Sequence, residues 1–296
     1  MYGTTSIWSD IKREFTSGNM VSQLIIINVA VFVIINLVTV VVFLTSGSMV
    51  NPLLPWIMLR ADVMDLLKHP WTLLTHMFAH YSIWHLLFNM LWLYWFGRII
   101  QEFIGGKKIL PLYIYGGITG AALLIISYNI FPGLQSDMPY VSALGASAGV
   151  LAIVVAAATL VPDYTVFLLF FGGVKIKYIA LFMVILDLVS IPGLNSGGYI
   201  AHLGGALFGY LFIKQLQMGH DWSKPFNDFL EVVGGLFKRK EPRVIYKTKT
   251  PGQKKKRYQE DKQQQVDAIL DKIAQSGYDS LTKEEKEFLF KVSKDE

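Results

Sequence analysis

The stretch LGASAGV, residues 144–150, places one serine between two glycines. It fits the pattern G-x-S-x-G, which surrounds the nucleophilic serine of soluble α/β-hydrolases, where a strand precedes the serine and a helix follows it. Ser147 is therefore a candidate nucleophile. The alternative is a serine that only packs within a helix of small residues, where glycine and alanine let another helix approach closely. The choice depends on which other groups lie near Ser147 and on the elements that carry them.

A histidine in the stretch AHLGGALFG, residues 201–209, supplies a candidate base for this serine. Imidazole is the usual group that takes the proton from a serine hydroxyl. Gly205 and Gly209 follow His202 at i+3 and i+7, so all three share one face of a helix. That glycine face would let its helix press against the small residues around Ser147, and would bring the His202 imidazole within hydrogen-bond reach.

Hydrogen-bond donors for a developing oxyanion come from the stretch WHLLFN. His85 and Asn89 are four residues apart and therefore share a helix face. Both can donate hydrogen bonds, and so can the free backbone N–H groups at the start of the helix that Ser147 opens. His85, Asp187 and His202 are ionisable residues in strongly apolar segments, where charge is costly and usually serves a function.

The composition is that of a membrane protein. The chain has 296 residues, of which 53% are hydrophobic and 17% charged, whereas an average soluble domain is about 25% charged; its mean hydropathy is +0.42. The sequence holds no cysteine, which excludes disulfides, thiolate nucleophiles and cysteine-based zinc sites. The N-terminal residues lack a basic region that leads into an apolar core, so no secretory signal peptide is predicted.

Six apolar runs predict membrane-spanning helices, each of which needs about 20 residues. A further apolar run, 166–174, is too short to span and is expected to be a connector or an interfacial segment. Ser147 then opens a membrane helix with no strand before it, so the interpretation as an α/β-hydrolase serine fails. The predicted spans are residues 24–44, 82–101, 109–130, 143–161, 177–191 and 199–216.

Lys and Arg residues predict the orientation of these spans. If the N-terminus is cytoplasmic, nearly all of them fall on the cytoplasmic side, and only Arg60 and Lys68 fall outside. This positive-inside pattern requires an even number of spans and puts both termini in the cytoplasm. The long outer loop 45–81 combines tryptophans and prolines with short apolar runs, which favours a partly buried loop at the membrane interface.

The segment after the last apolar run predicts a peripheral tail. Aromatic and aliphatic side chains at helical spacing in 222–238 indicate an amphipathic helix on the inner membrane surface. Ten Lys or Arg residues in 238–257 favour a disordered linker that faces anionic lipid, so no nucleic-acid partner is expected. Beyond it, Gly277 ends one predicted helix and Thr282 with Glu285 forms a capping box that opens another.

The expected organisation therefore has one large and several small parts. The C-terminal helical hairpin could recruit a cytoplasmic partner, or it could serve only as a solubilising tail. The predicted parts are an N-terminal segment (1–20), a six-span domain (21–217), an amphipathic helix with a basic linker (218–258) and the hairpin (259–296).

Three stretches together closely resemble the rhomboid family of intramembrane serine proteases. They are THMFAHYSIWHLLFNMLWLYWFG at 75–97, LGASAG at 144–149 and AHLGGALFG at 201–209, in the family's order. The resemblance extends over roughly residues 50–215. It implies an all-α membrane protein with a six-transmembrane-helix bundle, to which the tail adds a small cytoplasmic helical hairpin.

The resemblance also implies roles for the candidate residues. Ser147 would be the nucleophile and His202 its general base, a dyad without a third carboxylate. His85, Asn89 and the backbone N–H of Ser147 would hold the oxyanion, and no metal or other cofactor is implied. The family cleaves single-pass membrane proteins within or beside a transmembrane helix, near the outer face in bacteria. Such substrates and membrane lipids are therefore the expected partners, and a bacterial inner membrane is the expected location.

Two positions depart from the family's common pattern. Well-studied members often have a Trp-Arg pair in the first loop, where this chain has Trp71 followed by Thr72. Some place a tyrosine four residues after the serine, against the catalytic histidine, where this chain has Leu151. These differences concern the anchoring of the loop and the packing of the imidazole, and neither removes a catalytic group.

Three alternatives stay open. A zinc site could use His76, His80 and His85, although no H-E-x-x-H motif and no nearby carboxylate accompany them; the first two are otherwise expected to hydrogen-bond the first loop to the second span. The chain could be an inactive rhomboid-like protein that binds membrane helices. It could also transport a small solute, with Asp187 and His202 as a proton relay. A serine-directed covalent probe separates all three.

Overall fold

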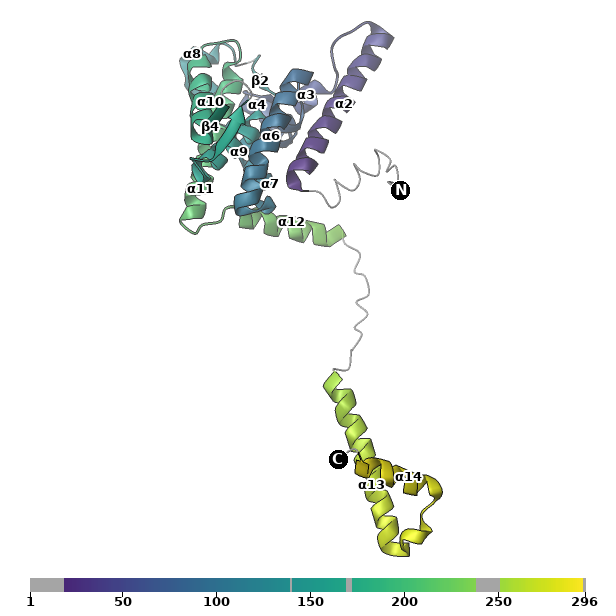
Figure 1. Ribbon diagram of the computed structural model, residues 1–296. Helices are drawn as coiled ribbons and strands as arrows, with labels where there is room; N and C mark the ends of the chain where they lie inside the picture. The colour runs from purple at the N-terminus through teal and green to yellow at the C-terminus, as the bar shows by residue number, and fades with distance from the viewer. Residues whose placement is uncertain (1–18, 139, 169–171, 238–250, 295–296) are drawn as a thin grey trace. The chain divides into compact units, whose positions relative to one another are not determined.

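The computed structural model describes residues 19–138, 140–168, 172–237 and 251–294. The chain divides into two compact units, Met1–Phe237 and Lys238–Glu296, and each is described by itself (Figure 1). Most of the predicted N-terminal segment and the part of the basic linker before Pro251 lie outside the described residues.

A helix forms within each of the six apolar runs (Figure 1). Within the described residues, two helical stretches are both long and apolar enough to cross a membrane, Met20–Ser46 and Gly106–Ile130. That the helices in the other four apolar runs also cross the membrane stays a prediction. The helices are α2 (Met20–Ser46), α6 (Ile83–Ile104), α7 (Ile109–Ile130), α9 (Ser147–Leu160), α10 (Ile176–Ser190) and α11 (Ser196–Gln217).

Helices α9 and α11 pack with their backbones in direct contact. A Cβ atom on Gly205 would lie 2.0 Å from the carbonyl oxygen of Ala148, and one on Gly209 would lie 2.1 Å from that of Ala152. Such short distances leave room for a hydrogen atom alone. The predicted contact between the glycine face of the His202 helix and the small residues after Ser147 is therefore confirmed.

The segment between α2 and α6 is folded rather than extended. A buried network fixes it, because the Tyr113 hydroxyl of α7 donates to the Met77 carbonyl (2.6 Å) and the Asn28 side chain of α2 donates to that hydroxyl (3.2 Å). Leu59 and Ala61 are fully buried, whereas Trp56 and Trp71 are exposed, as expected of a partly buried loop. Its elements are α3 (Leu54–Ile57), β1 (Leu59–Arg60), α4 (Val63–Lys68), α5 (Thr72–Thr75) and the 3-10 helix η1 (His76–Phe78).

The fold is mostly helical, as predicted, and two short antiparallel strand pairs that the prediction lacked add to it. Strand β2 (Ser142–Ala143) pairs with β1, so a strand does precede Ser147, although it is only two residues long. In the segment expected to be a connector, β3 (Thr165–Leu168) pairs with β4 (Gly172–Lys175). Threonine, valine and phenylalanine favour extended backbone, and a run too short to cross a membrane satisfies its backbone groups by forming a hairpin.

Helix α12 (Ser223–Phe237) follows α11 and packs against α7. Lys108, at the end of the 3-10 helix η2 (Gly106–Lys108), pairs with Asp221. The ring of Phe226 meets Tyr115 edge to face at 5.3 Å. Phe229, three residues after Phe226, is exposed. A helix therefore forms over the segment predicted to be amphipathic, and its position on the inner membrane surface stays a prediction. A further short helix, α8 (Pro132–Gln135), lies between α7 and β2.

The second unit is the predicted helical hairpin. It consists of α13 (Pro251–Ser276), the 3-10 helix η3 (Tyr278–Ser280) and α14 (Lys283–Lys294). The capping box is confirmed, since the Thr282 N–H donates to Glu285 Oε2 at 2.7 Å and the Glu285 N–H donates to Thr282 Oγ1 at 3.3 Å. Helix α13 begins at Pro251, eight residues before the predicted start at 259, so part of the expected linker is helical.

Candidate active site

Ser147 is the first residue of α9, directly after a constrained turn. Gly145 has φ +135°, a backbone conformation that residues with a side chain rarely adopt. A Cβ atom there would also lie 2.6 Å from Cε1 of His85. Glycine therefore lets the turn before Ser147 come against the His85 imidazole, which places a hydrogen-bond donor beside the backbone that leads into the serine.

His202 lies on α11 and faces Ser147. Its Nε2 is 2.6 Å from the Ser147 Oγ. The contact follows from the glycine face described above, because Gly205 and Gly209 bring α11 against the first turns of α9. A serine hydroxyl at this distance can pass its proton to the imidazole.

Asp187 of α10 contacts the opposite nitrogen of the same ring. Its Oδ1 is 3.0 Å from His202 Nδ1, and the residue is buried. The predicted dyad did not include this carboxylate, and whether the catalytic unit is a dyad stays a prediction. Sequence reasoning singled out Asp187 only as an ionisable residue in an apolar segment and as a possible relay partner of His202 in a transporter. It did not connect Asp187 with the predicted pair of His202 and Ser147.

His76 and His80 hold the turn that precedes Ser147. The Gly145 N–H donates to the His76 carbonyl at 2.9 Å, and the Ala146 N–H donates to His80 Nε2 at 3.3 Å. The expectation that these side chains bind the first loop to the second predicted span is therefore wrong. The His80 ring binds the turn before α9, and the His76 Nδ1 lies 2.7 Å from the Thr72 carbonyl within the loop. Burial lowers the pKa of His76 to about 4 and, together with the nearby His85, lowers the pKa of His80 to about 3. Both rings are neutral at pH 7, so His80 Nε2 is free to accept.

His85 and Asn89 differ in their access to the site. His85 lines the same cavity as Ser147 and His202. Asn89 is buried, and its side chain donates to the His85 carbonyl at 2.8 Å, within their own helix. The structure thus brings His85 to the serine and keeps the Asn89 carboxamide engaged elsewhere.

Other contacts are found near the two positions that depart from the family's common pattern. The Thr72 hydroxyl donates to the His69 carbonyl at 2.7 Å and is buried, which ties the first loop to itself. Leu151 is buried in the core of the bundle. An aromatic ring still lies beside the histidine, because Tyr199 meets His202 edge to face with centroids 6.3 Å apart.

A cavity of about 350 Å³ opens over Ser147. Tyr81, Ser142 and Asn195 add polar groups to it that sequence reasoning missed, since nothing in their spacing connects them to the serine. Among the described residues, no group of three or more His, Cys, Asp or Glu side chains could hold a metal ion. The cavity lining is His76, Tyr81, His85, Ser142, Ala143, Leu144, Gly145, Ser147, Ala148, Asn195, Gly198, Ala201 and His202.

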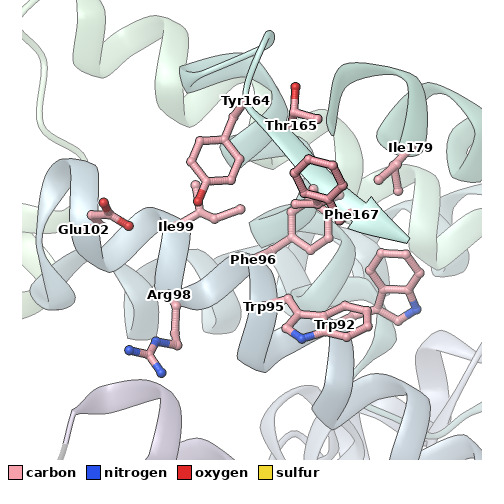
Figure 2. Close-up of a pocket in the computed structure, with 11 residues that line it drawn as sticks. Trp92, Trp95, Phe96, Arg98, Ile99, Glu102, Tyr164, Thr165, Phe167 and Ile179 are labelled. Atoms are coloured by element: carbon pink, nitrogen blue, oxygen red, sulfur yellow. The ribbon is translucent and has the colours of Figure 1, made fainter. Parts of the chain in front are cut away.

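A second cavity, of about 440 Å³, lies toward the other end of α9, between α6, β3 and α10. Figure 2 shows its aromatic side chains together, with Arg98 and Glu102 to one side. The Arg98 guanidinium donates to the Tyr94 hydroxyl at 2.8 Å. The lining is Trp92, Trp95, Phe96, Arg98, Ile99, Glu102, Tyr164, Thr165, Val166, Phe167 and Ile179.

Two family models match the chain, one in each unit. A family model described as "Rhomboid domain" matches residues 67–217, which is half of the chain. Another, described as "Family of unknown function (DUF6576)", matches residues 253–295 in the hairpin. The first match covers every element that contributes to the Ser147 cavity.

Curated relatives agree with the first match. "RHOMBOID-like protein 12, mitochondrial" of Arabidopsis thaliana is 31% identical over 157 residues, which cover 50% of this chain and 47% of that protein. "Presenilin-associated rhomboid-like protein A, mitochondrial" of Danio rerio is 30% identical over 156 residues, 50% of this chain and 37% of that protein. "Rhomboid protease GlpG" of Haemophilus influenzae is 33% identical over 84 residues, 25% of this chain and 44% of that protein. The chain therefore spans less than half the length of each of these relatives.

Proposed function

The chain belongs to the rhomboid family of integral membrane proteins, and on that basis we propose that it is an intramembrane serine endopeptidase. The observation that carries the proposal is the 2.6 Å contact between Ser147 Oγ and His202 Nε2 inside a cavity. One of the relatives is itself named a rhomboid protease. The reaction is peptide-bond hydrolysis through an acyl-enzyme.

The proposed mechanism uses groups on three helices. Ser147 Oγ attacks the scissile carbonyl while His202 Nε2 takes its proton. The His85 imidazole and the backbone N–H of Ser147 stabilise the oxyanion. His202 then gives the proton to the leaving amine, and a water molecule, activated by the same histidine, hydrolyses the ester. Asn89 would join the oxyanion hole through the second N–H of its carboxamide, or after the carboxamide releases the His85 carbonyl.

The proposed topology has six spans with both termini in the cytoplasm. It is supported by a helix in each of the six apolar runs and by the positive-inside pattern of Lys and Arg. Ser147 would then lie near the outer face, where single-pass membrane proteins would be cut within or beside their transmembrane helix. We place the chain in a bacterial inner membrane on the same topology, although two of the relatives named above are mitochondrial.

The tail is proposed to act from the cytoplasmic side. Its basic linker would bind anionic lipid at about 1 kcal/mol per Lys or Arg near the surface. The hairpin would present itself to a cytoplasmic partner or serve as a solubilising tail, and neither half enters the reaction.

A serine-directed fluorophosphonate tests the proposal. The full-length protein in detergent is expected to be labelled, and mass spectrometry should find the adduct on Ser147. Neither Ser147→Ala nor His202→Ala should be labelled, and neither should cleave a single-pass model substrate. The matched control is Ser190→Ala at the end of α10. Cleavage that persists in Ser147→Ala would refute the proposal, and absence of both labelling and cleavage in the folded wild type would favour an inactive binding protein.

A further inference from the structure

The apolar helix α10 carries one carboxylate that turns away from the outer surface of the bundle. Its neighbours Leu186 and Leu188 are about half exposed, at 50% and 58%, whereas Asp187 is 8% exposed. A carboxylate in an apolar segment is costly unless it is paired. Within the described part of the chain, the partner of Asp187 is the Nδ1 atom of His202.

We propose that Asp187 is a positioning residue that orients His202 toward Ser147, which makes the site a Ser-His-Asp triad. This inference rests on the proposed function. It is carried by two contacts on the two nitrogens of one ring, 3.0 Å from Asp187 Oδ1 to Nδ1 and 2.6 Å from Nε2 to Ser147 Oγ. The two contacts fix the ring from both sides.

The chemistry of the three groups sets the tautomer. A carboxylate can only accept hydrogen bonds, so the neutral imidazole keeps its proton on Nδ1 and donates it to Asp187. Nε2 is then unprotonated and faces the Ser147 hydroxyl, as a general base requires. Without the carboxylate, both tautomers would be populated, and the one with a proton on Nε2 could not accept the serine proton.

The carboxylate also balances the charge that forms during the reaction. When Ser147 attacks, its proton moves to His202 Nε2, which turns the ring into an imidazolium. The Nδ1 proton stays on the ring, and Asp187 remains ionised and hydrogen-bonded to it. The positive charge therefore forms beside a fixed negative charge, and the return of the proton to the leaving amine restores the starting state.

Asp187 could instead serve only to tie α10 to α11, and the two roles predict different kinetics. If the contact only holds α10 against α11, its loss should loosen the bundle and lower the melting temperature. A positioning residue acts on the chemical step, so its loss lowers kcat while KM and the melting temperature stay the same. Restoration of the charge by glutamate should then return part of kcat.

The experiment measures kcat, KM and Tm of the full-length protein in liposomes with a single-pass model substrate. We expect Asp187→Asn to lower kcat about 10²-fold or more, since loss of the triad carboxylate in soluble serine proteases costs about 10⁴-fold. Asp187→Glu should recover at least a tenth of the wild-type kcat. Asp163→Asn is the matched control, because that aspartate pairs with Lys175 and Lys177 far from the serine, and its kcat should not change.

Two results would overturn the inference: a kcat of Asp187→Asn within about threefold of wild type, or a loss of kcat that follows a fall in Tm equally in the Asn and Glu variants. If Asp187→Asn does not fold in detergent, the rate of fluorophosphonate labelling of Asp187→Ala is measured in native membranes with added formate. Acceleration by formate, but not by chloride, supports the role, and no acceleration overturns it. Activity that persists in Ser147→Ala would instead refute the proposed function, whereas inactive Ser147→Ala beside fully active Asp187→Asn refutes this inference alone.

Discussion

The aromatic cavity and the Ser147 cavity, both in the first unit (Met1–Phe237, here the membrane unit), differ in how their polar groups are arranged. The larger one, about 440 Å³, is lined mainly by aromatic side chains, and its two charged groups, Arg98 and Glu102, lie to one side (Figure 2). The smaller one, about 350 Å³, gathers hydroxyl and imidazole groups around Ser147. Size and apolar lining therefore do not locate the candidate active site, whereas the contact between a potential nucleophile and a potential base does.

The two cavities also differ in how many segments of the chain supply their side chains. The aromatic cavity takes nearly all of its lining from two segments, α6 and residues 164–167. The Ser147 site takes its groups from α6, α9, α10 and α11, and it closes only because two glycines let α11 touch α9. A site built from distant segments depends on packing at every contact, and variants should show this dependence.

The largest effect is expected at the reacting groups. Ser147→Ala and His202→Ala should each lower kcat by about 10⁴-fold or more, and the double variant should equal either single one, because groups that act as a unit are not additive. Phe167→Ala in the aromatic cavity is the control and should keep kcat within about threefold. If Phe167→Ala lowered kcat as much as Ser147→Ala does, the reaction would depend on both cavities, and the functional distinction between them would fail. A chelator should change nothing, and inhibition by EDTA that zinc reverses would instead favour a metal site.

The next effect separates the two candidate oxyanion donors. Loss of one such donor typically costs about 10²–10³ in kcat. His85→Ala should reach this range, because His85 lines the cavity. Asn89→Ala should cost much less, because its carboxamide bonds the His85 carbonyl. Steady-state kinetics of both variants measure this, and equal losses would show that Asn89 turns into the site when substrate binds.

The glycine contact gives a smaller effect on both rate and stability. In Gly205→Ala the added methyl group would meet the Ala148 carbonyl, so α11 must shift. Overpacking of this kind costs about 1–3 kcal/mol, and a displacement of His202 by about 1 Å can cost about 10²-fold in rate. Gly235→Ala on α12 has open space around it and is the matched control. If Gly205→Ala kept wild-type kcat and Tm, direct backbone contact would not be what holds the site.

A pH effect on stability is expected from the two histidines that hold the turn before Ser147. Their pKa values in the folded protein, about 4 for His76 and about 3 for His80, lie below the ordinary 6.5. The unfolded chain therefore binds more protons, and stability falls as the pH drops below about 6.5. Each unit of decrease costs up to about 1.4 kcal/mol per histidine. Melting temperatures at pH 7.5 and 5.5 measure the loss, which should be smaller in His80→Asn; a flat profile would contradict burial of neutral rings.

Sequence reasoning located the helices and the serine–histidine pair because both leave local signals. Apolar runs mark the helices, and glycines at i+3 and i+7 from His202 mark a close helix contact. The two-residue strand β2 leaves no such signal, since its pairing with β1 joins residues more than eighty positions apart. The contact of Asp187 with His202 also depends on the rotation of α10, which its mainly apolar sequence does not fix. The engagement of Asn89 could not be predicted either, because a shared face does not decide which acceptor a carboxamide selects.

The smallest effect is expected from removal of the second unit. The sequence placed the end of the catalytic part near Gln217, but α12 belongs with the membrane unit, because Asp221 pairs with Lys108 and Phe226 contacts Tyr115. A chain that ends at Phe237 should therefore keep kcat within about twofold of full length, since the hairpin contributes no residue to the Ser147 cavity. A chain that ends at Gln217 loses these contacts and should melt at a lower temperature, even if it still cleaves. Both chains are compared with full length in liposomes, after each is shown to be monodisperse in detergent. Loss of cleavage in a well-folded chain ending at Phe237 would show that the hairpin supports the active state, and the separation of the two units into a catalytic and a peripheral part would fail.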